Sequence, residues 1–337
     1  MKRDVKLYDS TLRDGSHAVH HQYTAEIVKN VCKGLEEAGI YAAEVGHGGG
    51  LGGSTIQFGF GKESDETLLK AAKTVLKNTK LSVLLVPGLG TMDDLKMAAE
   101  CGVDIVRVAV HCTELDVGMQ HIKLAKELGL EAAAFFMMSH MISADDLADQ
   151  AKIAQGYGVD YVFIADSSGA MTPQDIRERV EKVKAVVTVP VGVHCHNNLA
   201  LGVGNSVAAF EAGADIIDGT LQGLGAGCGN TPTEVLAAVF NKMGVETGCD
   251  MFKVMDVGEK YIVPIKPRPI EVTNETLILG YTGIYSSFYL HTLDVAKRYH
   301  LDPRDIFVEL GNRKVVGGQE DMIINVALDL IAQREKE

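Results

Sequence analysis

Three side chains with complementary chemistry lie close together near the start of the chain. Arg13 supplies a permanent cation, Asp14 a carboxylate and His17 an imidazole, and all three directly follow a short strand-like run. Together they could bind a metal ion and an oxygen-rich substrate and could move a proton.

A second group of the same kind lies far downstream. His194 and His196 flank Cys195 at the end of a β-branched run. On a strand both imidazoles point to one face and Cys195 to the other. With Asp14 they would form a facial set of nitrogen and oxygen ligands that suits Mn²⁺, Mg²⁺, Co²⁺ or Zn²⁺. The alternative is that one of these histidines is only a hydrogen-bonded core residue.

The roles of Arg13 and His17 allow two interpretations. Arg13 beside Asp14 could be a simple ion pair, which at a surface contributes only about 0–1 kcal/mol. Alternatively, Arg13 faces a substrate carbonyl or a developing enolate oxygen while Asp14 binds metal. His17 is then the group that transfers a proton, although His20 and His21 are equally available nearby.

The elements around these residues alternate between strand-like and helix-like runs. Eight β-branched runs, each followed by an amphipathic segment, predict a parallel sheet closed into a (β/α)8 TIM barrel. A doubly wound open sheet is the alternative, but the strand count and a length of about 245 residues favour the barrel. The strand candidates are residues 4–9, 42–46, 81–86, 104–110, 131–137, 159–165, 189–194 and 214–219, and the helical candidates are 24–38, 65–78, 91–101, 115–129, 143–157, 172–186, 200–212 and 231–243.

A barrel gathers its active site at the carboxyl ends of its strands. The candidate residues lie at these ends, together with Glu44, His47 and several glycine-rich loops. After residue 245 the pattern changes, and segments 250–262, 274–300 and 318–335 read as helical. We therefore expect a TIM-barrel catalytic domain over 1–245 and a small helical C-terminal domain over 246–337.

Composition limits the classes of function. The 337 residues are 46% hydrophobic and carry a formal charge of −13, which argues against nucleic acid and anionic membranes as partners. Six cysteines without a C-x-x-C pair indicate a reducing, cytoplasmic setting. The start, Met1 to Asp4, leads into a strand and shows no signal peptide, and no apolar run reaches the roughly 18 residues of a membrane helix.

Several motifs together resemble one known family. They are Ser10-Thr-Leu-Arg-Asp-Gly-Ser-His17 with His21-Gln-Tyr23, Phe58-Gly-Phe-Gly61, His111-Cys-Thr-Glu114, Met137-Met-Ser-His-Met141, Gly280-Tyr-Thr-Gly-Ile-Tyr-Ser-Ser-Phe288 and Val316-Gly-Gly-Gln-Glu-Asp-Met322. The chain resembles, nearly end to end, the metal-dependent 4-hydroxy-2-oxovalerate aldolases, which belong to the metallolyase barrels with hydroxymethylglutaryl-CoA lyase and isopropylmalate synthase. The last two motifs are the most specific for the aldolase branch.

The resemblance implies a class II aldolase that cleaves 4-hydroxy-2-oxopentanoate to pyruvate and acetaldehyde, as in aromatic hydrocarbon catabolism. It implies that Asp14, His194 and His196 hold the divalent metal, usually Mn²⁺, with Mg²⁺ or Co²⁺ as alternatives. Arg13 would stabilise the pyruvate enolate, and His17 would take the proton from the C4 hydroxyl. Tyr285, from the C-terminal domain, would assist proton transfer or position the aldehyde. The substrate contacts would come from Arg13, Ser167, His194 and Tyr285.

The sequence also departs from the aldolase pattern. Asn197 stands where a histidine is usual, His20 replaces a common arginine, and the loop Gly46-His-Gly-Gly-Gly50 has glycines where alanine and aspartate are more common. These positions lie around the mouth of the expected site and leave the ligand set intact.

The family usually pairs with an acylating acetaldehyde dehydrogenase, in a heterotetramer, which takes up the aldehyde through a channel. The apolar faces of 274–300 and 318–335 suit that contact, and equally a homodimer or packing on the barrel. Two other functions compete with the aldolase: an acyl-CoA condensing enzyme or lyase on the same barrel, and a non-catalytic scaffold subunit. Neither a CoA site nor a regulatory tail is recognisable, and the complete residue set argues against a scaffold.

Overall fold

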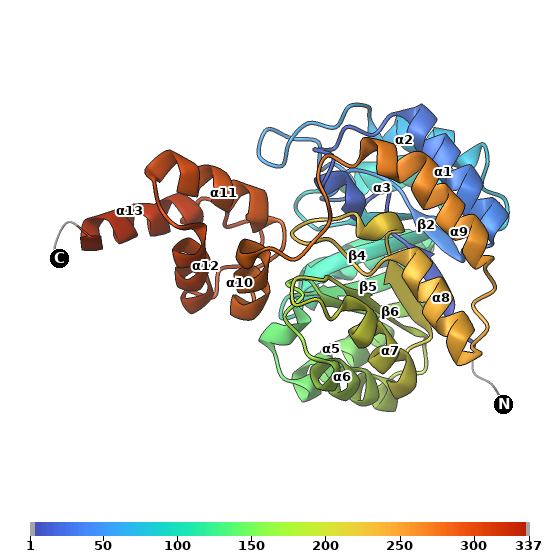
Figure 1. The fold of residues 1–337 in the computed structure, drawn as a ribbon. Helices are drawn as coiled ribbons and strands as arrows, with labels where there is room; N and C mark the ends of the chain where they lie inside the picture. The colour runs from blue at the N-terminus through green and yellow to red at the C-terminus, as the bar shows by residue number, and fades with distance from the viewer. Residues whose placement is uncertain (1–3, 335–337) are drawn as a thin grey trace.

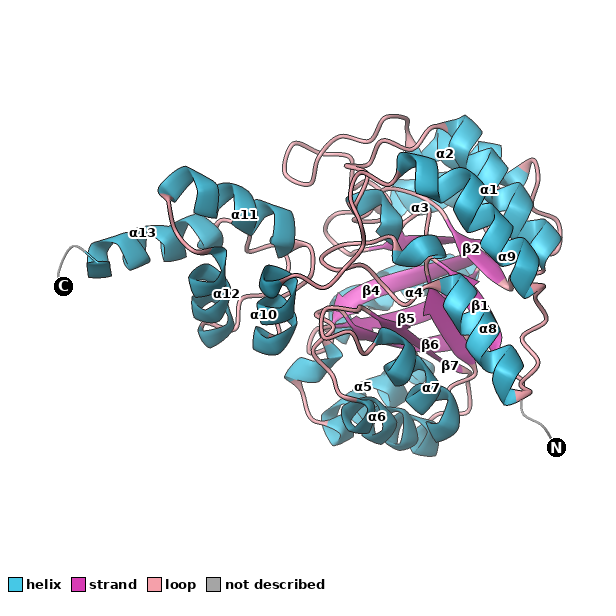
Figure 2. Ribbon diagram, in the orientation of Figure 1, coloured by secondary structure: helices cyan, strands magenta, loops and turns pink. Residues whose placement is uncertain are grey.

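The chain folds into a closed barrel of eight parallel strands with a group of helices beside it (Figure 1; Figure 2). This computed structural model describes residues 4–334. The first three and last three residues, which include the start of the chain and the outer limits of the two expected domains, lie outside the described residues. Strands follow one another around the barrel in chain order, and β1 pairs with β8. That pairing closes the sheet and rules out the open doubly wound alternative.

All eight predicted strands are present, with ends that differ by at most two residues from the prediction. They are β1 (Lys6–Asp9), β2 (Ala42–Glu44), β3 (Lys80–Leu85), β4 (Ile105–His111), β5 (Glu131–Met137), β6 (Tyr161–Asp166), β7 (Val191–Cys195) and β8 (Ile216–Gly219).

A helix follows each strand, and local capping explains where several of them begin. The side chains of Thr91, Ser143 and Thr172 each accept a hydrogen bond from the third residue of the helix they precede. Pro173 adds a fixed φ at the first position of its helix. The eight helices are α1 (Ala25–Ala38), α2 (Asp65–Lys73), α3 (Met92–Glu100), α4 (Met119–Glu127), α5 (Ala144–Gly156), α6 (Pro173–Val186), α7 (Gly202–Ala212) and α8 (Thr233–Met243).

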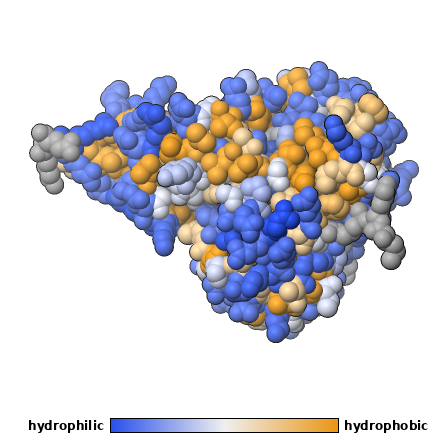
Figure 3. Space-filling model, turned by 60° about the horizontal axis from the view of Figure 1, so that its bottom comes forward, coloured by the Kyte–Doolittle hydropathy of each residue, from blue (hydrophilic) through white to orange (hydrophobic). Residues whose placement is uncertain are grey.

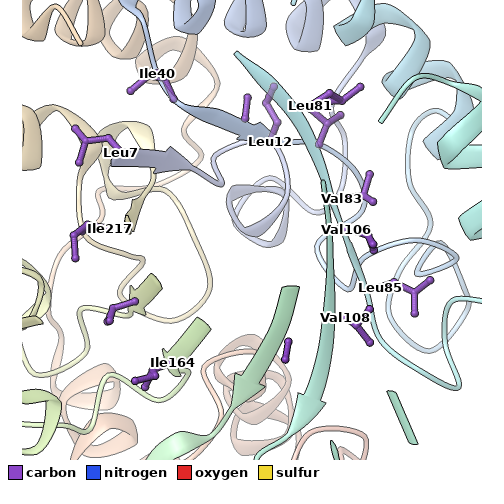
Figure 4. Packing of buried hydrophobic residues seen from close by; sticks show 14 of the residues in the cluster. Leu7, Leu12, Ile40, Leu81, Val83, Leu85, Val106, Val108, Ile164 and Ile217 are labelled. Carbon is purple, nitrogen blue, oxygen red and sulfur yellow. The ribbon is translucent and has the colours of Figure 1, made fainter. Parts of the chain in front are cut away.

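The barrel has two apolar regions. The larger one lies between the strands and the surrounding helices, and Figure 4 shows part of it, including Leu7, Leu81 and Val106 from three different strands. The smaller one lies on the inward faces of the strands and includes Phe135 and Phe163. Alternation along each strand separates the two sets, as period-two side-chain geometry requires.

The segment after residue 245 begins with a helix that belongs to the barrel by its packing. In α9 (Met251–Val257), Val254 and Val257 are buried in the larger barrel cluster, and Ile262 follows them there. The expected division at residues 245 and 246 remains a prediction, and this packing favours counting α9 with the barrel.

The remaining helices form a second apolar cluster of their own and stand to one side of the barrel (Figure 1). They are α10 (Asn274–Thr282), α11 (Phe288–Tyr299), α12 (Pro303–Asn312) and α13 (Met322–Arg334). The stretch 274–300, expected to be helical, contains two helices, because Gly283 with φ 73° ends α10 there. Helix α12 was not predicted, although Asp302 and Pro303 carry the signal of a helix start.

Polar contacts fasten these helices to the loops after β6 and β7. Ser286 donates from both its N–H (3.2 Å) and its Oγ (2.7 Å) to the carbonyl oxygen of Ser167. Asn198 donates to Ser286 Oγ at 2.9 Å, and Ser168 Oγ donates to the carbonyl oxygen of Gly283 at 3.0 Å. The C-terminal helices therefore sit at the end of the barrel where the strands finish.

None of the helices within residues 4–334 is long and apolar enough to cross a membrane.

Candidate active site

The turn after β1 brings Asp14 into the centre of the strand ends. A tight turn, in which the N–H groups of Arg13 and Asp14 donate to the carbonyl oxygen of Ser10, leads into a short 3-10 helix over Asp14–His17. Asp14 accepts hydrogen bonds from Arg13 Nη1 at 2.7 Å and from Asn230 Nδ2 at 2.8 Å. Burial opposes its charge, but Arg13 and the nearby histidines hold the pKa of Asp14 well below its usual range.

The two histidines of the His-x-His motif meet Asp14 at this point. His194 Nε2 lies 3.7 Å and His196 Nε2 3.9 Å from Asp14 Oδ2, and the two Nε2 atoms are 3.4 Å apart. One donor atom from each of the three residues lies within 4.8 Å of the others, and all three residues are buried. Cys195 points away from the cluster into the outer apolar core, as the strand alternation predicts.

The chemistry of this donor set fits a divalent cation. His194 Nδ1 lies 2.8 Å from the carboxylate of Asp218, an acceptor, so Nδ1 donates its proton there and Nε2 is the ring nitrogen that faces the cluster. Burial lowers the pKa of His196 to about 4, despite the charge of Asp14, and keeps that ring neutral. Neutral imidazoles and an ionised carboxylate are the forms that bind metal.

The charges around the site also favour a bound cation. Two guanidinium groups, Arg13 and Arg107, face three carboxylates, those of Asp14, Glu44 and Asp218. The cluster therefore carries one more negative than positive charge in a buried setting. A buried charge without a partner is costly, and a bound cation would balance it. The buried group of Asp14, His194 and His196 could bind a divalent metal.

Arg13 is oriented by two carboxylates and keeps one nitrogen free. Its Nε donates to Glu44 at 2.6 Å and its Nη1 to Asp14 at 2.7 Å. Its Nη2 is buried and has no hydrogen-bond partner among residues 4–334. Burial opposes the positive charge, but Glu44 and Asp14 raise the pKa of Arg13 further above its usual value. An unpartnered buried N–H group is well suited to receive a substrate oxygen.

His17 and Tyr285 line one cavity of about 620 Å³. Around them the wall is mostly apolar and includes Val86, Ala109 and Met137. Burial lowers the pKa of His17, so the ring is neutral near pH 7 and able to accept a proton. Burial also raises the pKa of Tyr285 to about 12, with Asp14 adding to the effect, so the phenol keeps its proton.

The other histidines at the mouth have different surroundings. His21 stacks on His47, with ring centroids 3.7 Å apart, and accepts from Gly48 N at 3.3 Å. His20 is exposed, and it lines a second cavity, of about 320 Å³, that His17 also lines. Of His17, His20 and His21, only His17 lines the cavity that Tyr285 also lines.

The remaining predicted residues are placed as follows. Ser167 Oγ accepts a hydrogen bond from Met138 N at 3.0 Å. The carbonyl oxygen of Ser167 accepts a hydrogen bond from Ser286, the residue next to Tyr285. Asn197 turns away from the cluster, since its Oδ1 accepts from Gly202 N at 3.0 Å at the start of α7.

Glycine is required where the loop after β8 passes Asp14. A Cβ atom on Gly225 would lie 2.8 Å from Asp14 Oδ1 and 2.3 Å from Asn230 Nδ2. Any side chain there would displace the carboxylate or the amide that orients it.

Three residues of the site were missed by sequence reasoning: Arg107, Asp218 and Asn230. Arg107 carried a usable signal, because it is the one charged residue in a strand that is otherwise apolar up to His111. Asp218 and Asn230 look ordinary in sequence, since each acts through a partner on another strand or loop.

Comparison with known proteins gives one consistent result. Residues 4–260 match the HMGL-like family, and residues 270–332 match the DmpG-like communication domain. The 4-hydroxy-2-oxovalerate aldolase of Carboxydothermus hydrogenoformans is 56% identical over 98% of both chains, and that of Moorella thermoacetica 53% identical over 98% of both. The HMG-CoA lyase of Brucella melitensis is 18% identical, with a TM-score of 0.68 over 79% of this chain and 100% of that one, and shares the barrel fold.

Proposed function

The chain belongs to the 4-hydroxy-2-oxovalerate aldolases, and on this premise we propose how its residues carry out the cleavage of 4-hydroxy-2-oxopentanoate to pyruvate and acetaldehyde. The enzyme is a carbon–carbon lyase. The observation that carries the mechanism is the convergence of Asp14, His194 and His196 within 4.8 Å beside the unpartnered Nη2 of Arg13.

Asp14, His194 and His196 hold a divalent ion, and Mn²⁺ is the one we propose, with Mg²⁺ and Co²⁺ as alternatives. When bound there, such an ion supplies Lewis-acid polarisation of the carbonyl next to the bond that breaks. We propose that His194 contributes to substrate binding as well, because its Nε2 lies 3.7 Å from Asp14 Oδ2 in the same cluster.

Arg13 stabilises the enolate oxygen that forms as the C3–C4 bond breaks. The electron pair of that bond moves to C3 and is delocalised onto the C2 oxygen. Donors that are already fixed in place stabilise such a charge without reorganisation. Glu44 and Asp14 fix the guanidinium of Arg13 in this way, which leaves Nη2 for the substrate.

His17 accepts the proton of the C4 hydroxyl, and the C4 oxygen then becomes the aldehyde carbonyl. The enolate takes up one proton at C3 to become pyruvate, and His17 gives up the proton it accepted, so the two transfers balance. The neutral ring in the cavity supports this role. Tyr285, on the wall of the same cavity, keeps its phenol proton and assists proton transfer or positions the aldehyde. Ser167 holds the carboxylate of the substrate, since its hydroxyl accepts from Met138 N and has its own proton to donate.

The test is a pyruvate-release assay on 4-hydroxy-2-oxopentanoate with protein stripped by EDTA and then supplied with Mn²⁺. We expect activity only after metal is added. Asp14→Asn should lose Mn²⁺ affinity and activity together, by about 100-fold or more, because even the residues that orient metal ligands affect affinity by roughly 10–100-fold. Retained Mn²⁺ affinity in Asp14→Asn would contradict its ligand role.

The same assay addresses the competing functions. Folded wild-type protein that binds Mn²⁺ but releases no pyruvate would favour acyl-CoA condensation. Protein that neither binds metal nor cleaves the substrate would favour a scaffold. The high identity to aldolases over nearly the whole chain supports the aldolase over both.

The communication domain implies interaction with a partner dehydrogenase. We propose that this partner is an acylating acetaldehyde dehydrogenase bound in a heterotetramer, with a homodimer as the alternative. Apolar side chains exposed on the C-terminal helices support such a contact, among them Leu277 and Tyr281 on α10 and Leu328 on α13. Figure 3 shows apolar surface that extends from these helices onto the barrel. Light scattering of the chain alone and with the dehydrogenase distinguishes the two assemblies.

A cytoplasmic location completes the proposal. All six cysteines are free, and five of them are buried, which suits a reducing compartment. Fractionation of cells that express the untagged chain would test it.

A further inference from the structure

A fully buried arginine lies at the centre of the barrel. Arg107 on β4 has no exposed surface, and its guanidinium lies between three aromatic rings, 4.3 Å from the centroid of Tyr8, 4.7 Å from that of Phe135 and 5.1 Å from that of Phe163. A charge this deep is costly unless it is paired and hydrogen-bonded. The mechanism above does not use Arg107, so its presence needs a reason.

One side of Arg107 reaches the residue that orients the substrate-binding arginine. Its Nε donates to Glu44 Oε1 at 2.6 Å, and its Nη2 donates to Glu44 Oε2, which makes a bidentate pair. The same Oε2 atom accepts from Arg13 Nε at 2.6 Å. The position of the Glu44 carboxylate, and with it the direction of Arg13, therefore depends on Arg107.

The other side of Arg107 reaches the residue that orients a metal-binding histidine. Its Nη1 donates to Asp218 Oδ2 at 2.5 Å, and the same oxygen lies 2.8 Å from His194 Nδ1. Ser10 Oγ holds the second oxygen of Asp218 at 2.7 Å. Asp218 fixes the tautomer and the ring direction of His194, and Arg107 fixes Asp218.

We propose that Arg107 is a positioning residue that orients Arg13 through Glu44 and His194 through Asp218, so that one buried guanidinium sets the substrate-binding and the metal-binding groups together. This inference rests on the proposed function, which gives Arg13 and His194 those roles. Arg107 itself touches neither substrate nor metal.

The geometry also says why this residue is an arginine. A guanidinium presents several N–H groups in a flat, rigid fork and can bind two carboxylates at once, while stacking on aromatic rings. An ammonium group on a flexible chain acts as a single point charge. A lysine at this position would have to favour Glu44 or Asp218, and one of the two connections would loosen.

The experiment measures two affinities and the melting temperature for Arg107→Met and Arg107→Lys. The first affinity is that of the metal-free protein for Mn²⁺, and the second is that of the Mn²⁺-saturated protein for pyruvate, both by calorimetry. We expect Arg107→Met to weaken both by about tenfold or more, the size seen when residues that orient metal ligands are removed. Arg107→Lys should keep more of one affinity than of the other.

Arg179 is the matched control. It is also a buried arginine, 8% exposed, but its guanidinium donates to the backbone carbonyl oxygens of Ser139, Asp175 and Ile142 and to no carboxylate within residues 4–334. Arg179→Met should lower the melting temperature and leave both affinities within twofold of wild type. A merely structural role for Arg107 would give the same result.

The outcomes separate this inference from the function on which it rests. If the wild-type protein binds neither Mn²⁺ nor pyruvate, the proposed function fails. If the wild type binds both and Arg107→Met and Arg107→Lys change only the melting temperature, the positioning role is wrong. Should Arg107→Met not fold, Arg107→Lys decides: loss of either affinity supports the role, and two unchanged affinities overturn it.

Discussion

At the scale of single residues, the site depends on which groups are charged and which are neutral. Asp14 and the arginines are ionised, whereas His196 is neutral with a pKa of about 4 and Tyr285 is protonated with a pKa of about 12. Burial is the main cause for both neutral groups, and it acts in opposite directions on an acid and a base. The site therefore holds acceptors and donors in the forms that the cleavage needs near pH 7.

His17 gives a prediction for pH dependence. Burial lowers the pKa of His17 below that of a free histidine, so the ring becomes protonated only at pH values below about 6.5. A protonated ring cannot accept the C4 hydroxyl proton, so kcat/KM should be flat above pH 6.5 and should fall at lower pH. His17→Ala should remove this acid limb and most of the activity, and an unchanged limb would assign it to another group.

Tyr285→Phe tests the contribution of the C-terminal domain to turnover. Loss of the hydroxyl should lower kcat by roughly 10²-fold, the lower end for a proton-transferring group, and leave Mn²⁺ affinity unchanged. Tyr281→Phe is the control, because Tyr281 is 79% exposed on the helix that precedes Tyr285. Equal kcat values for the two variants would mean that Tyr285 has only a packing role in the protein and none in turnover.

At the scale of elements, strand ends and helix starts are joined by buried polar pairs. Asp9, the last residue of β1, accepts from Thr11 N at 3.0 Å and from Thr233 Oγ1 at 2.6 Å, at the first residue of α8. Burial raises the pKa of Asp9 to about 7, although these hydrogen bonds lower it. The folded protein thus binds a proton here that the unfolded chain, with a pKa of about 3.9, releases.

Asp9→Asn tests this link through stability. Because the folded-state pKa of Asp9 is raised, its contribution is greatest below pH 4 and is lost as the pH rises to 7. The variant has no such loss, so its free energy of unfolding should rise relative to wild type by roughly 2 to 3 kcal/mol between pH 5 and pH 8. Denaturant melts at both pH values measure it, and a difference that does not vary with pH would refute the shift.

Elements with strong local signals could be predicted from the sequence. The strands of the barrel and the caps at Thr91, Ser143 and Thr172 are local features of this kind, and the structure contains them. The break at Gly283 was missed because the apolar pattern continues across it, and only the backbone turn shows that two helices meet there.

The site was predictable only in part, for a physical reason. Asp14, His194 and His196 are recognisable because their types and spacing suit a metal ion, and the structure brings them together. Asp218 and Asn230 matter only through contacts with residues 24 and 216 positions away, to His194 and Asp14 respectively. Contacts between residues so far apart in the chain form only when the barrel closes, and no local sequence pattern predicts them.

At the scale of the whole molecule, the C-terminal helices rest on the barrel through a close, polar contact. Gly280 in α10 is part of it, since a Cβ atom there would lie 2.9 Å from the Cβ of Asn198 and 3.2 Å from the carbonyl oxygen of Gly169. Tyr285 follows five residues later, so its position depends on this contact between Gly280 and the barrel.

Gly280→Ala should therefore shift α10 away from the barrel and move Tyr285. We expect kcat to fall by about tenfold, since displacements near 1 Å can cost up to about 10²-fold, with Mn²⁺ affinity unchanged. Gly204→Ala in α7 is the control, because a Cβ atom there meets no atom within 4 Å. It should leave kcat unchanged and slightly raise the melting temperature.

The position of Tyr285 in the chain also has a consequence during synthesis on the ribosome. The barrel can close once β8 has emerged, but Tyr285 follows Gly219, the end of that strand, by a further 66 residues. At about 5–20 residues per second this is an interval of roughly 3 to 13 seconds. During that interval all eight strands have been made but Tyr285 has not, so on the proposed mechanism a nascent chain cleaves substrate more slowly than the finished one.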